Sequence, residues 1–180
     1  MKKVAIFGKP GSGKSRLAKR LAEQTGLPLH PTDSLIYDEN GNPRDPAMYV
    51  QEHAALLASE QWIIDGFAPF TAINTFYERL NSADTLIYID LPYWLSYWFV
   101  TKRLIKGLLG KTPEGWPEGS SIVQGSLASY QTLKLCPKFW NEGFVEKLKQ
   151  IVEDDPQGKR LILIRSKREL DGFTGNHHMC

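Results

Sequence analysis

A glycine-rich turn near the start of the chain carries the residues whose types and spacing best suit chemistry with phosphate groups. Residues 8–15 read GKPGSGKS, which fits the pattern G-x-x-x-x-G-K-S. Glycines let the backbone curl so that successive N–H groups point inward and bind an anion. Lys14 supplies a positive charge for the outer phosphates, and the hydroxyl of Ser15 can bind Mg²⁺. The pattern therefore predicts a site for the phosphates of a nucleoside triphosphate.

The alternative interpretation of this turn is a glycine-rich connection that binds no ligand. Its surroundings favour phosphate binding, because an apolar run typical of a strand precedes the turn and an amphipathic run typical of a helix follows it. The N-terminus of that helix would add the positive end of its dipole. The residues expected to bind the nucleotide here are Gly8, Lys9, Pro10, Gly11, Ser12, Gly13, Lys14 and Ser15.

Three aspartates follow apolar runs and could complete a site for phosphoryl transfer. Asp65 ends the run WIID, Asp90 ends TLIYID, and Asp33 follows LPLH by three residues. The carboxyl ends of parallel strands are where such sheets bind ligands, and Mg²⁺ on a polyphosphate needs a carboxylate partner, usually through water. We expect Asp65 near the metal and Asp33 beside the phosphoryl acceptor, with Asp90 third. For each, a capping or loop role is the alternative.

The strands that must position these residues follow from the apolar runs. Nearly continuous apolar stretches predict strands over residues 3–7, 62–65, 85–90 and 160–165, and a shorter one over 27–30. Helical patterns lie between the strands. This alternation predicts an α/β fold in which helices cover both faces of a parallel sheet.

The helices are predicted from their periodicity and their end signals. The first ends at Gly26, and the second opens at Asp45 and Pro46 and runs to about Ser59. Apolar residues between Phe139 and Val152 predict a last long helix. The segment 107–125 is rich in glycine and proline, which predicts a loop or a flap.

The composition is that of an ordinary globular protein. The chain has 180 residues, 42% of them hydrophobic, and a formal net charge of +2. This charge favours no nucleic-acid partner. The most apolar window, residues 91–100, is about half as long as a membrane span, so we expect no membrane segment. The start of the chain lacks a signal-peptide pattern and the two cysteines cannot build a disulfide framework, so a cytoplasmic protein is expected. We expect it to be a monomer or a homodimer.

Other residues suited to chemistry have simpler interpretations. The aromatic segment 93–99 could stack on a ring, but its helical spacing favours the protein core. His30 is better explained as a strand-end residue, and the adjacent His177 and His178 do not have the spacing of a metal site. Cys136 has no base nearby in the sequence, so a nucleophilic role is not expected.

The quoted stretches resemble the adenylate-kinase-like P-loop kinases. The resemblance rests on GKPGSGKS after the first strand, on WIIDGF and TLIYIDLP, and on an arginine in the helix that follows; it extends from residue 3 to about 170. LPLHPTDSLIY and RLILIRSKREL are similar to segments of small bacterial proteins described as "DNA topology modulation" or adenylate-kinase-related proteins. Only the glycine-rich motif is highly specific.

The resemblance implies a three-layer P-loop NTPase fold with a five-stranded parallel sheet in the order 2-3-1-4-5. It implies a single domain over residues 1–174, with an acceptor-binding segment at about 30–60, a lid at about 104–125 and a frayed tail at 175–180. ATP and Mg²⁺ would be the cofactors, with Ser15 and Asp65 at the metal. Arg103 would contact the transferring phosphates, and Arg168 would touch the base.

The sequence departs from the family in its arginines. Adenylate kinases carry Gly-Phe-Pro-Arg after the third strand, whereas residues 66–70 here read GFAPF, and no arginine lies between Arg103 and Arg160. A phosphorylated acceptor is best held by guanidinium groups. Only Arg44, Arg79 and Arg103 are placed to supply them. A less charged acceptor, or slow transfer, would fit these differences.

The leading hypothesis is a kinase that moves the γ-phosphoryl group of ATP to a nucleotide or another small-molecule acceptor. Its expected catalytic residues are Lys14, Asp33, Asp65 and Arg103. The alternative is an NTP-binding regulatory or NTPase module without an acceptor, with or without an association with DNA. A guanine-reading motif is not found, because TKRL at residues 101–104 lacks the required aspartate.

Overall fold

The structure is a computed structural model and describes residues 1–38, 42–110 and 121–174. Within these residues, one parallel sheet has the strand order β2-β3-β1-β4-β5. Its strands are β1 (Lys3–Gly8), β2 (Leu29–Pro31), β3 (Trp62–Asp65), β4 (Thr85–Ile89) and β5 (Arg160–Ile164). The predicted α/β fold and its strand order are confirmed, and all five predicted strands are present.

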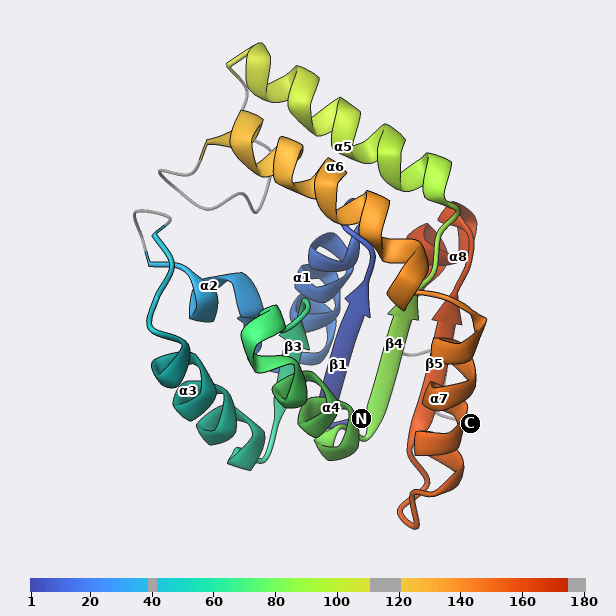
Figure 1. The fold of residues 1–180 in the computed structure, drawn as a ribbon. Coiled ribbons are helices and arrows are strands. Elements are labelled where there is room, and N and C mark those ends of the chain that lie inside the picture. Colours follow the sequence, from blue (N-terminus) through green and yellow to red (C-terminus); the bar gives the residue numbers. More distant parts are fainter. Residues whose placement is uncertain (39–41, 111–120, 175–180) are drawn as a thin grey trace.

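Alternate residues of the central strand β1 face two different layers of helices. Val4 and Ile6 pack in a cluster with Leu17 of α1 (Lys14–Thr25). Ala5 and Phe7 pack in a second cluster, to which α3 (Pro46–Ala58), α4 (Ile73–Ser82) and α7 (Glu142–Glu153) contribute. Figure 1 shows α1 behind the sheet and α3, α4 and α7 in front of it. Both faces of the sheet are thus covered, as the continuous apolar runs predicted.

The remaining helices lie near the carboxyl ends of the strands (Figure 1). They are α2 (Thr32–Ile36), the short 3₁₀ helix η1 (Phe70–Ala72), α5 (Tyr93–Leu108), α6 (Ile122–Phe139) and α8 (Lys167–Gly172). α5 and α6 pack against each other as a pair above the sheet. These elements therefore surround the edge of the sheet at which the strands leading to the predicted site residues end.

The ends of two helices match the sequence signals. α1 ends at Gly26, which has a φ of 72° and donates its N–H to the carbonyl oxygen of Ala22 at 2.8 Å. α3 begins after Asp45, whose side chain accepts the N–H of Ala47 at 2.8 Å, with Pro46 in the first helical position. Both predicted boundaries are confirmed.

The predicted last helix is confirmed as α7, but its predicted start is wrong, because Phe139 is the last residue of α6 and α7 begins at Glu142. The chain turns at Trp140, and Asn141 accepts the N–H of Phe144 at 3.1 Å to start α7. Likewise, α5 continues to Leu108 and α6 begins at Ile122, so helices occupy both ends of the predicted loop. Residues 111–120 of the predicted lid and the tail at 175–180, with His177 and His178, lie outside the described residues.

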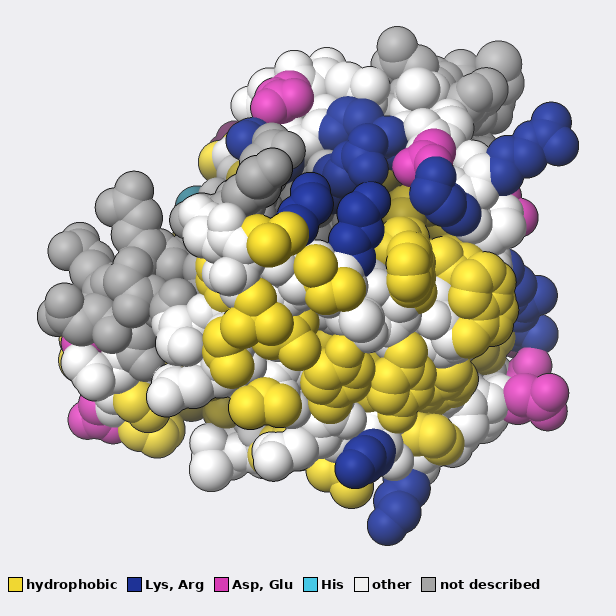
Figure 2. All heavy atoms as spheres, turned by 90° about the horizontal axis from the view of Figure 1, so that it is seen from above, with side chains coloured by type: hydrophobic (Ala, Val, Ile, Leu, Met, Phe, Trp, Pro, Cys, Tyr) yellow, Lys and Arg dark blue, Asp and Glu magenta, His cyan; other side chains and the backbone are white. Residues whose placement is uncertain are grey.

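The aromatic segment 93–99 is only partly in the core. Tyr93 and Tyr97 pack against buried residues, whereas Trp94 and Trp98 are 68% and 57% exposed. They share an outer face of α5 with Ile105 and Leu108, and Figure 2 shows hydrophobic side chains spread over this side of the molecule. The core prediction is therefore wrong for the two tryptophans. Within the described ranges, α5 and the other helices are all too short or too polar to cross a membrane.

Candidate active site

The glycine-rich turn lies between β1 and α1, and glycine is required at three of its positions. Gly11 and Gly13 have φ values of 70° and 83°, which lie in the left-handed region. A β-carbon added at Gly8 would lie 2.5 Å from the carbonyl oxygen of Ile89, and one at Gly11 would lie 2.7 Å from that of Ser96. The glycines of the motif are therefore required on steric grounds, because the loop packs closely against the backbone of β4 and α5.

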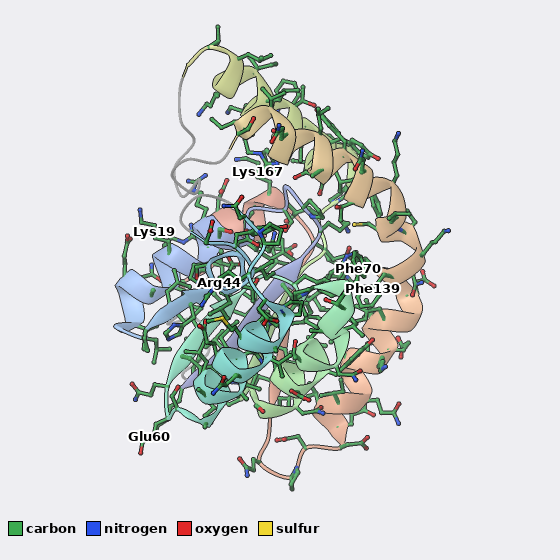
Figure 3. All side chains as sticks on the ribbon, turned by 60° about the vertical axis from the view of Figure 1, so that its left-hand side comes forward. Lys19, Arg44, Glu60, Phe70, Phe139 and Lys167 are labelled. Atoms are coloured by element: carbon green, nitrogen blue, oxygen red, sulfur yellow. The ribbon has the colours of Figure 1, made fainter. Side chains whose placement is uncertain are left out.

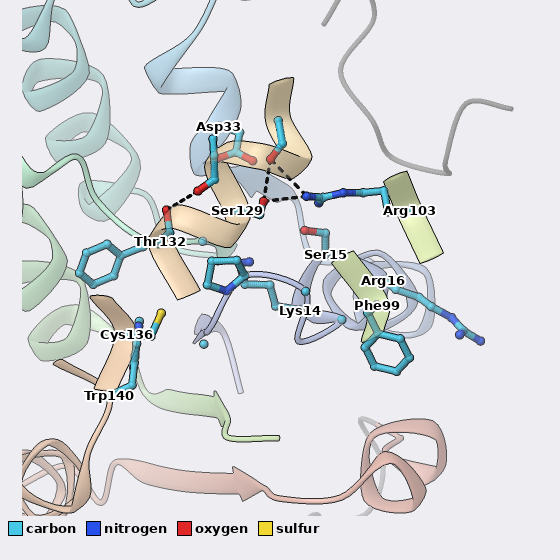
Figure 4. A pocket seen from close by; sticks show the side chains of 18 of the residues that line it. Lys14, Ser15, Arg16, Asp33, Phe99, Arg103, Ser129, Thr132, Cys136 and Trp140 are labelled. Atoms are coloured by element: carbon cyan, nitrogen blue, oxygen red, sulfur yellow. Dashed lines mark hydrogen bonds between the residues drawn. The ribbon is translucent and has the colours of Figure 1, made fainter. Parts of the chain in front are cut away.

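The N-terminus of α1 is open toward a cavity. Its N-cap residue Gly13 has no side chain to accept a hydrogen bond, and no acidic residue lies in the first turn. The N–H groups of a first turn have no partners inside their own helix. Lys14 and Ser15 line the same cavity (Figure 4). A phosphate placed here would meet backbone N–H groups, the helix dipole and the charge of Lys14.

Asp65 lies at the end of β3, and its surroundings include Lys14 and Ser15. The residue is only 4% exposed, and its Oδ1 atom has no hydrogen-bond partner among the described residues. Burial raises the pKa of Asp65, while the charge of Lys14 and a hydrogen bond with Ser15 oppose that rise. The next residue must be glycine, since a β-carbon at Gly66 would lie 2.0 Å from Oγ1 of Thr32.

These side chains fit a magnesium ion. The hydroxyl of Ser15 and the partnerless oxygen of Asp65 are hard oxygen donors of the kind that Mg²⁺ prefers. Nowhere in the described ranges, this site included, do three histidine, cysteine or acidic side chains gather closely enough to hold a metal. The ion would therefore need phosphate oxygens of a nucleotide as further ligands, which is the usual arrangement for Mg²⁺.

Asp33 and Arg103 reach the cavity from two different elements. Asp33 is exposed in the first turn of α2, and Arg103 extends from α5 toward α6 (Figure 4). The guanidinium of Arg103 donates to Oγ of Ser129 at 2.6 Å and to the carbonyl oxygen of Gly125 at 3.3 Å. Burial lowers the pKa of Arg103, and the charge of Asp33 opposes this. The structure thus brings both predicted residues to the cavity that holds Lys14 and Ser15.

Lys9 and Asp90 form an ion pair with each other. Nζ of Lys9 lies 2.5 Å from Oδ1 of Asp90 and 4.6 Å from the ring centre of Tyr93. The hydroxyl of Tyr88 donates to the same aspartate oxygen at 3.2 Å. Neither Lys9 nor Asp90 is among the residues that line the cavity. Asp90 therefore anchors the glycine-rich turn to β4, and Lys9 can offer a phosphate only its backbone.

The other residues predicted at the nucleotide have mixed positions. Pro10 lines the cavity, and Ser12 is buried with a hydroxyl that has no partner in the described part of the chain. Arg168 is exposed in α8 and does not line the cavity, whereas its neighbour Lys167 does. The contact between Arg168 and a base remains a prediction.

Two of the three arginines considered for an acceptor are tied to other groups. Arg44 donates to both carboxylate oxygens of Glu52, at 2.9 and 2.5 Å. Arg79 is fully buried, and its guanidinium donates to the carbonyl oxygen of Gly66 at 2.9 Å and to Nε2 of His53 at 3.2 Å. Burial lowers the pKa of Arg79 to about 10. Placing Arg79 as a phosphate clamp is therefore wrong, because the side chain is enclosed in the core.

The cavity has a volume of about 1490 Å³ and has walls of different character. Arg16, Lys167 and Leu170 form a wall from α1 and α8. A second wall, here called the aromatic wall, consists of Phe67, Phe70, Phe139 and Trp140. Sequence reasoning did not identify the aromatic wall. A usable signal existed for Phe67 and Phe70, because they directly follow the strand end that carries Asp65.

Comparison with solved structures identifies the fold. The chain resembles a shikimate kinase from Acinetobacter baumannii in complex with shikimate, with 15% identity and a TM-score of 0.55 over 95% of this chain and 88% of that one. A sugar kinase from Janibacter sp. HTCC2649 matches at 18% identity and a TM-score of 0.44, over 94% and 90% of the two chains. A gluconokinase from Sinorhizobium meliloti 1021 matches at 18% identity and a TM-score of 0.45, over 94% of this chain and 85% of that one.

No protein-family model matches the sequence, and neither does any curated protein sequence. The likeness to the shikimate kinase is one of fold, since so few residues are identical. With its five-stranded parallel sheet and its glycine-rich turn between β1 and α1, the chain shares its overall fold with this shikimate kinase.

Proposed function

We propose that the protein is a kinase that transfers the γ-phosphoryl group of ATP to a hydroxyl group of a small molecule. The observation that carries this proposal is the meeting of four side chains in one cavity. Lys14 and Ser15 at the N-terminus of α1, Asp33 from α2 and Arg103 from α5 all line it. A lysine, a hydroxyl, a carboxylate and a guanidinium around an open helix N-terminus suit phosphoryl transfer.

Each side chain has a definite task in this reaction. Lys14 and the N-terminus of α1 hold the β- and γ-phosphates, and Arg103 neutralises charge on the transferring group. Mg²⁺ held by Ser15 and by Asp65 through water would neutralise the remaining phosphate charge. The bond from the γ-phosphorus to the bridging oxygen of ADP breaks, and a bond to the acceptor oxygen forms. Asp33 accepts the proton of the acceptor hydroxyl, which yields ADP and a phosphate ester.

The fold supports a small-molecule acceptor. The shikimate kinase with the same fold was solved with shikimate, a small hydroxylated molecule. In this chain the cavity extends beyond the glycine-rich turn to α6 and to the residues after β3, which leaves room for a second substrate beside the nucleotide. We also propose a relation to the bacterial proteins described as "DNA topology modulation", which rests on the short sequence motifs alone.

An NTPase or regulatory module without an acceptor is the competing function. Asp33 and Arg103 argue against a module that only binds nucleotide, because binding alone requires neither a proton acceptor nor a guanidinium for the transferring group, whereas a kinase and an NTPase can use both. The two functions differ in one measurable respect. A kinase releases ADP much faster with its acceptor, whereas an NTPase releases ADP at the same rate without one.

The test is a coupled ADP-release assay on the full chain with ATP and Mg²⁺. Rates are measured without acceptor and with nucleosides, nucleoside monophosphates, sugars and hydroxy acids, and chelation of Mg²⁺ by EDTA serves as the control. We expect at least one acceptor to raise the rate tenfold or more. Equal rates with and without every acceptor would support the NTPase, and a failure to bind ATP at all would contradict both functions.

A further inference from the structure

The aromatic wall has the character of a ring-binding surface. Phe67 packs against its three neighbours, with ring centres 6.1 Å from Phe70, 5.1 Å from Phe139 and 5.5 Å from Trp140. Trp140 is buried, so the wall is anchored in the core. Figure 3 shows Phe70 and Phe139 next to each other, although they belong to η1 and α6. Side chains from two distant segments thus form one continuous apolar surface at the edge of the cavity.

Phe70 is the unusual member of this wall. It is 75% exposed, yet it lines the cavity and its ring contacts Phe67 alone among the described aromatic residues. Because the Phe70 ring is exposed and lines the cavity, a planar ligand bound there could stack against it. The exposure of Phe70 therefore points to a ring in the bound acceptor.

The cavity lining includes neutral polar side chains as well as charged ones. Ser129 and Thr132 of α6, Gln124 at its start and Asn42 before α3 all line the cavity. Hydroxyl and amide groups of this kind bind hydroxyls and ring nitrogens rather than neutralise an anion. They suit an acceptor that carries oxygen and nitrogen atoms but no net charge.

The arginines leave little capacity for an anionic acceptor. Every arginine of the chain lies among the described residues, and only Arg16, Arg20 and Arg103 line the cavity. Arg16 and Arg20 belong to α1, and Arg20 donates to carbonyl oxygens of α8 and of Phe173. Arg103 is then left for the γ-phosphoryl group itself. A phosphate on the acceptor would be held best by a second guanidinium fork, and the chain supplies none at the aromatic wall.

From these observations we infer that the acceptor is an uncharged alcohol that carries an aromatic ring, the chemistry of a nucleoside. The ring stacks on the aromatic wall, and the hydroxyl lies near Asp33 and receives the γ-phosphoryl group while its proton passes to Asp33. The products are ADP and the phosphate ester of the alcohol. This inference rests on the proposed kinase function. The exposed lysines that also line the cavity, Lys102, Lys138 and Lys167, are the groups that an anionic acceptor would use instead.

The experiment compares acceptors in pairs that differ only in charge. ADP release with saturating ATP and Mg²⁺ is measured for adenosine, guanosine, cytidine, uridine, thymidine and pyridoxine, and for the 5′-phosphate of each. Shikimate and gluconate are added as carboxylate acceptors. We expect kcat/KM for at least one uncharged alcohol to exceed that of its own phosphate and of both carboxylates by tenfold or more. A preference for a phosphate or a carboxylate overturns the inference.

Two variants test the place of the ring. Phe70→Ala should raise the KM of the preferred alcohol about 5- to 20-fold, because it removes the stacking partner, while kcat and the affinity for ATP stay within about twofold. Trp94→Ala removes an aromatic side chain of similar exposure that does not line the cavity, and it should change none of these constants. An unchanged KM in Phe70→Ala would contradict the stacking.

The failure of this inference can be told apart from the failure of the proposed function. Isothermal titration of ATP with Mg²⁺ into the full chain measures the nucleotide site without any acceptor. If ATP binds and an anionic acceptor is phosphorylated, the protein is a kinase and the inference is wrong. If ATP binds and no acceptor accelerates ADP release, the inference is also wrong. If ATP does not bind, the proposed function itself is wrong.

Discussion

The guanidinium of Arg79 donates a hydrogen bond to the carbonyl oxygen of Gly66 at 2.9 Å. Arg79 belongs to α4 and is fully buried, and Gly66 directly follows Asp65 at the end of β3. The same guanidinium donates to Nε2 of His53 in α3. A core arginine thus ties two helices to the loop that presents the predicted magnesium ligand. This contact replaces the phosphate clamp that the sequence suggested.

Removal of this arginine should destabilise the protein. In Arg79→Met, the carbonyl oxygen of Gly66 and Nε2 of His53 both lose a donor inside the core. We expect the free energy of unfolding to fall by about 2 to 4 kcal/mol, as is usual for buried polar groups left unpaired. Urea denaturation measures the change. The exposed Arg165→Met is the control and should stay within about 0.5 kcal/mol; equal stability of the two variants would refute this role.

His53 should make the stability depend on pH. Burial and the nearby charge of Arg79 lower the pKa of His53 to about 4 in the folded state, against about 6.5 in an unfolded chain. As the pH falls below about 6.5, the unfolded state binds a proton before the folded state does, so the free energy of unfolding decreases. The loss from this residue alone is about 2 kcal/mol between pH 8 and pH 5.

The measurement for His53 is a difference between two proteins. Urea denaturation of the wild type and of His53→Gln is measured at pH 8 and at pH 5. The difference between the two proteins removes the contribution of all other titrating groups. We expect the variant to lose about 2 kcal/mol less than the wild type over this range. Parallel losses in both proteins would mean that His53 does not control the acid sensitivity.

The sequence was sufficient for the sheet because β1, β3 and β4 are buried on both faces and read as continuous apolar runs. It was insufficient for α6, whose glycine, serines and proline weaken the helical pattern, and for the boundary at Asn141. That boundary has a local signal, an asparagine cap followed by Glu142.

The site was predictable where a motif determines the backbone and unpredictable where tertiary contacts select the partner. Lys14 and Ser15 reach the cavity because the glycine-rich turn places them at the start of α1. The pairing of Lys9 with Asp90 and the enclosure of Arg79 depend on residues more than 20 positions apart in the sequence. The aromatic wall has the same origin, since Phe67 meets Phe139 and Trp140 at the end of α6 only in the folded chain.

Asp65→Asn should abolish activity that depends on Mg²⁺ without unfolding the protein. Burial already raises the pKa of Asp65, so a neutral amide of the same size costs little stability at this position. The loss of the negative charge should lower kcat by roughly 100-fold or more, an effect of the size seen when a group that stabilises transition-state charge is removed. ADP-release kinetics at several Mg²⁺ concentrations test this. Turnover at the wild-type level would remove Asp65 from the metal site.

Arg103→Ala should lower kcat far more than it changes the KM for ATP. Its guanidinium is expected to act on the transferring group, where charge changes during the reaction, and such arginines contribute roughly 10³-fold or more to kcat. Lys106→Ala, one turn further along α5 and outside the cavity lining, is the matched loss of a positive charge and should leave kcat unaltered. A similar kcat in Arg103→Ala and the wild type would assign Arg103 to structure alone, through Ser129 and Gly125.

Binding of ATP at the N-terminus of α1 is the central claim, and isothermal titration of the wild type and of Lys14→Ala with ATP and Mg²⁺ tests it most directly. Lys19→Ala, an exposed lysine on the same helix that does not line the cavity, is the matched control. We predict one bound nucleotide per chain, an affinity at least tenfold weaker in Lys14→Ala, and no change in Lys19→Ala. Equal affinity in all three proteins, or no binding by the wild type, would contradict the account.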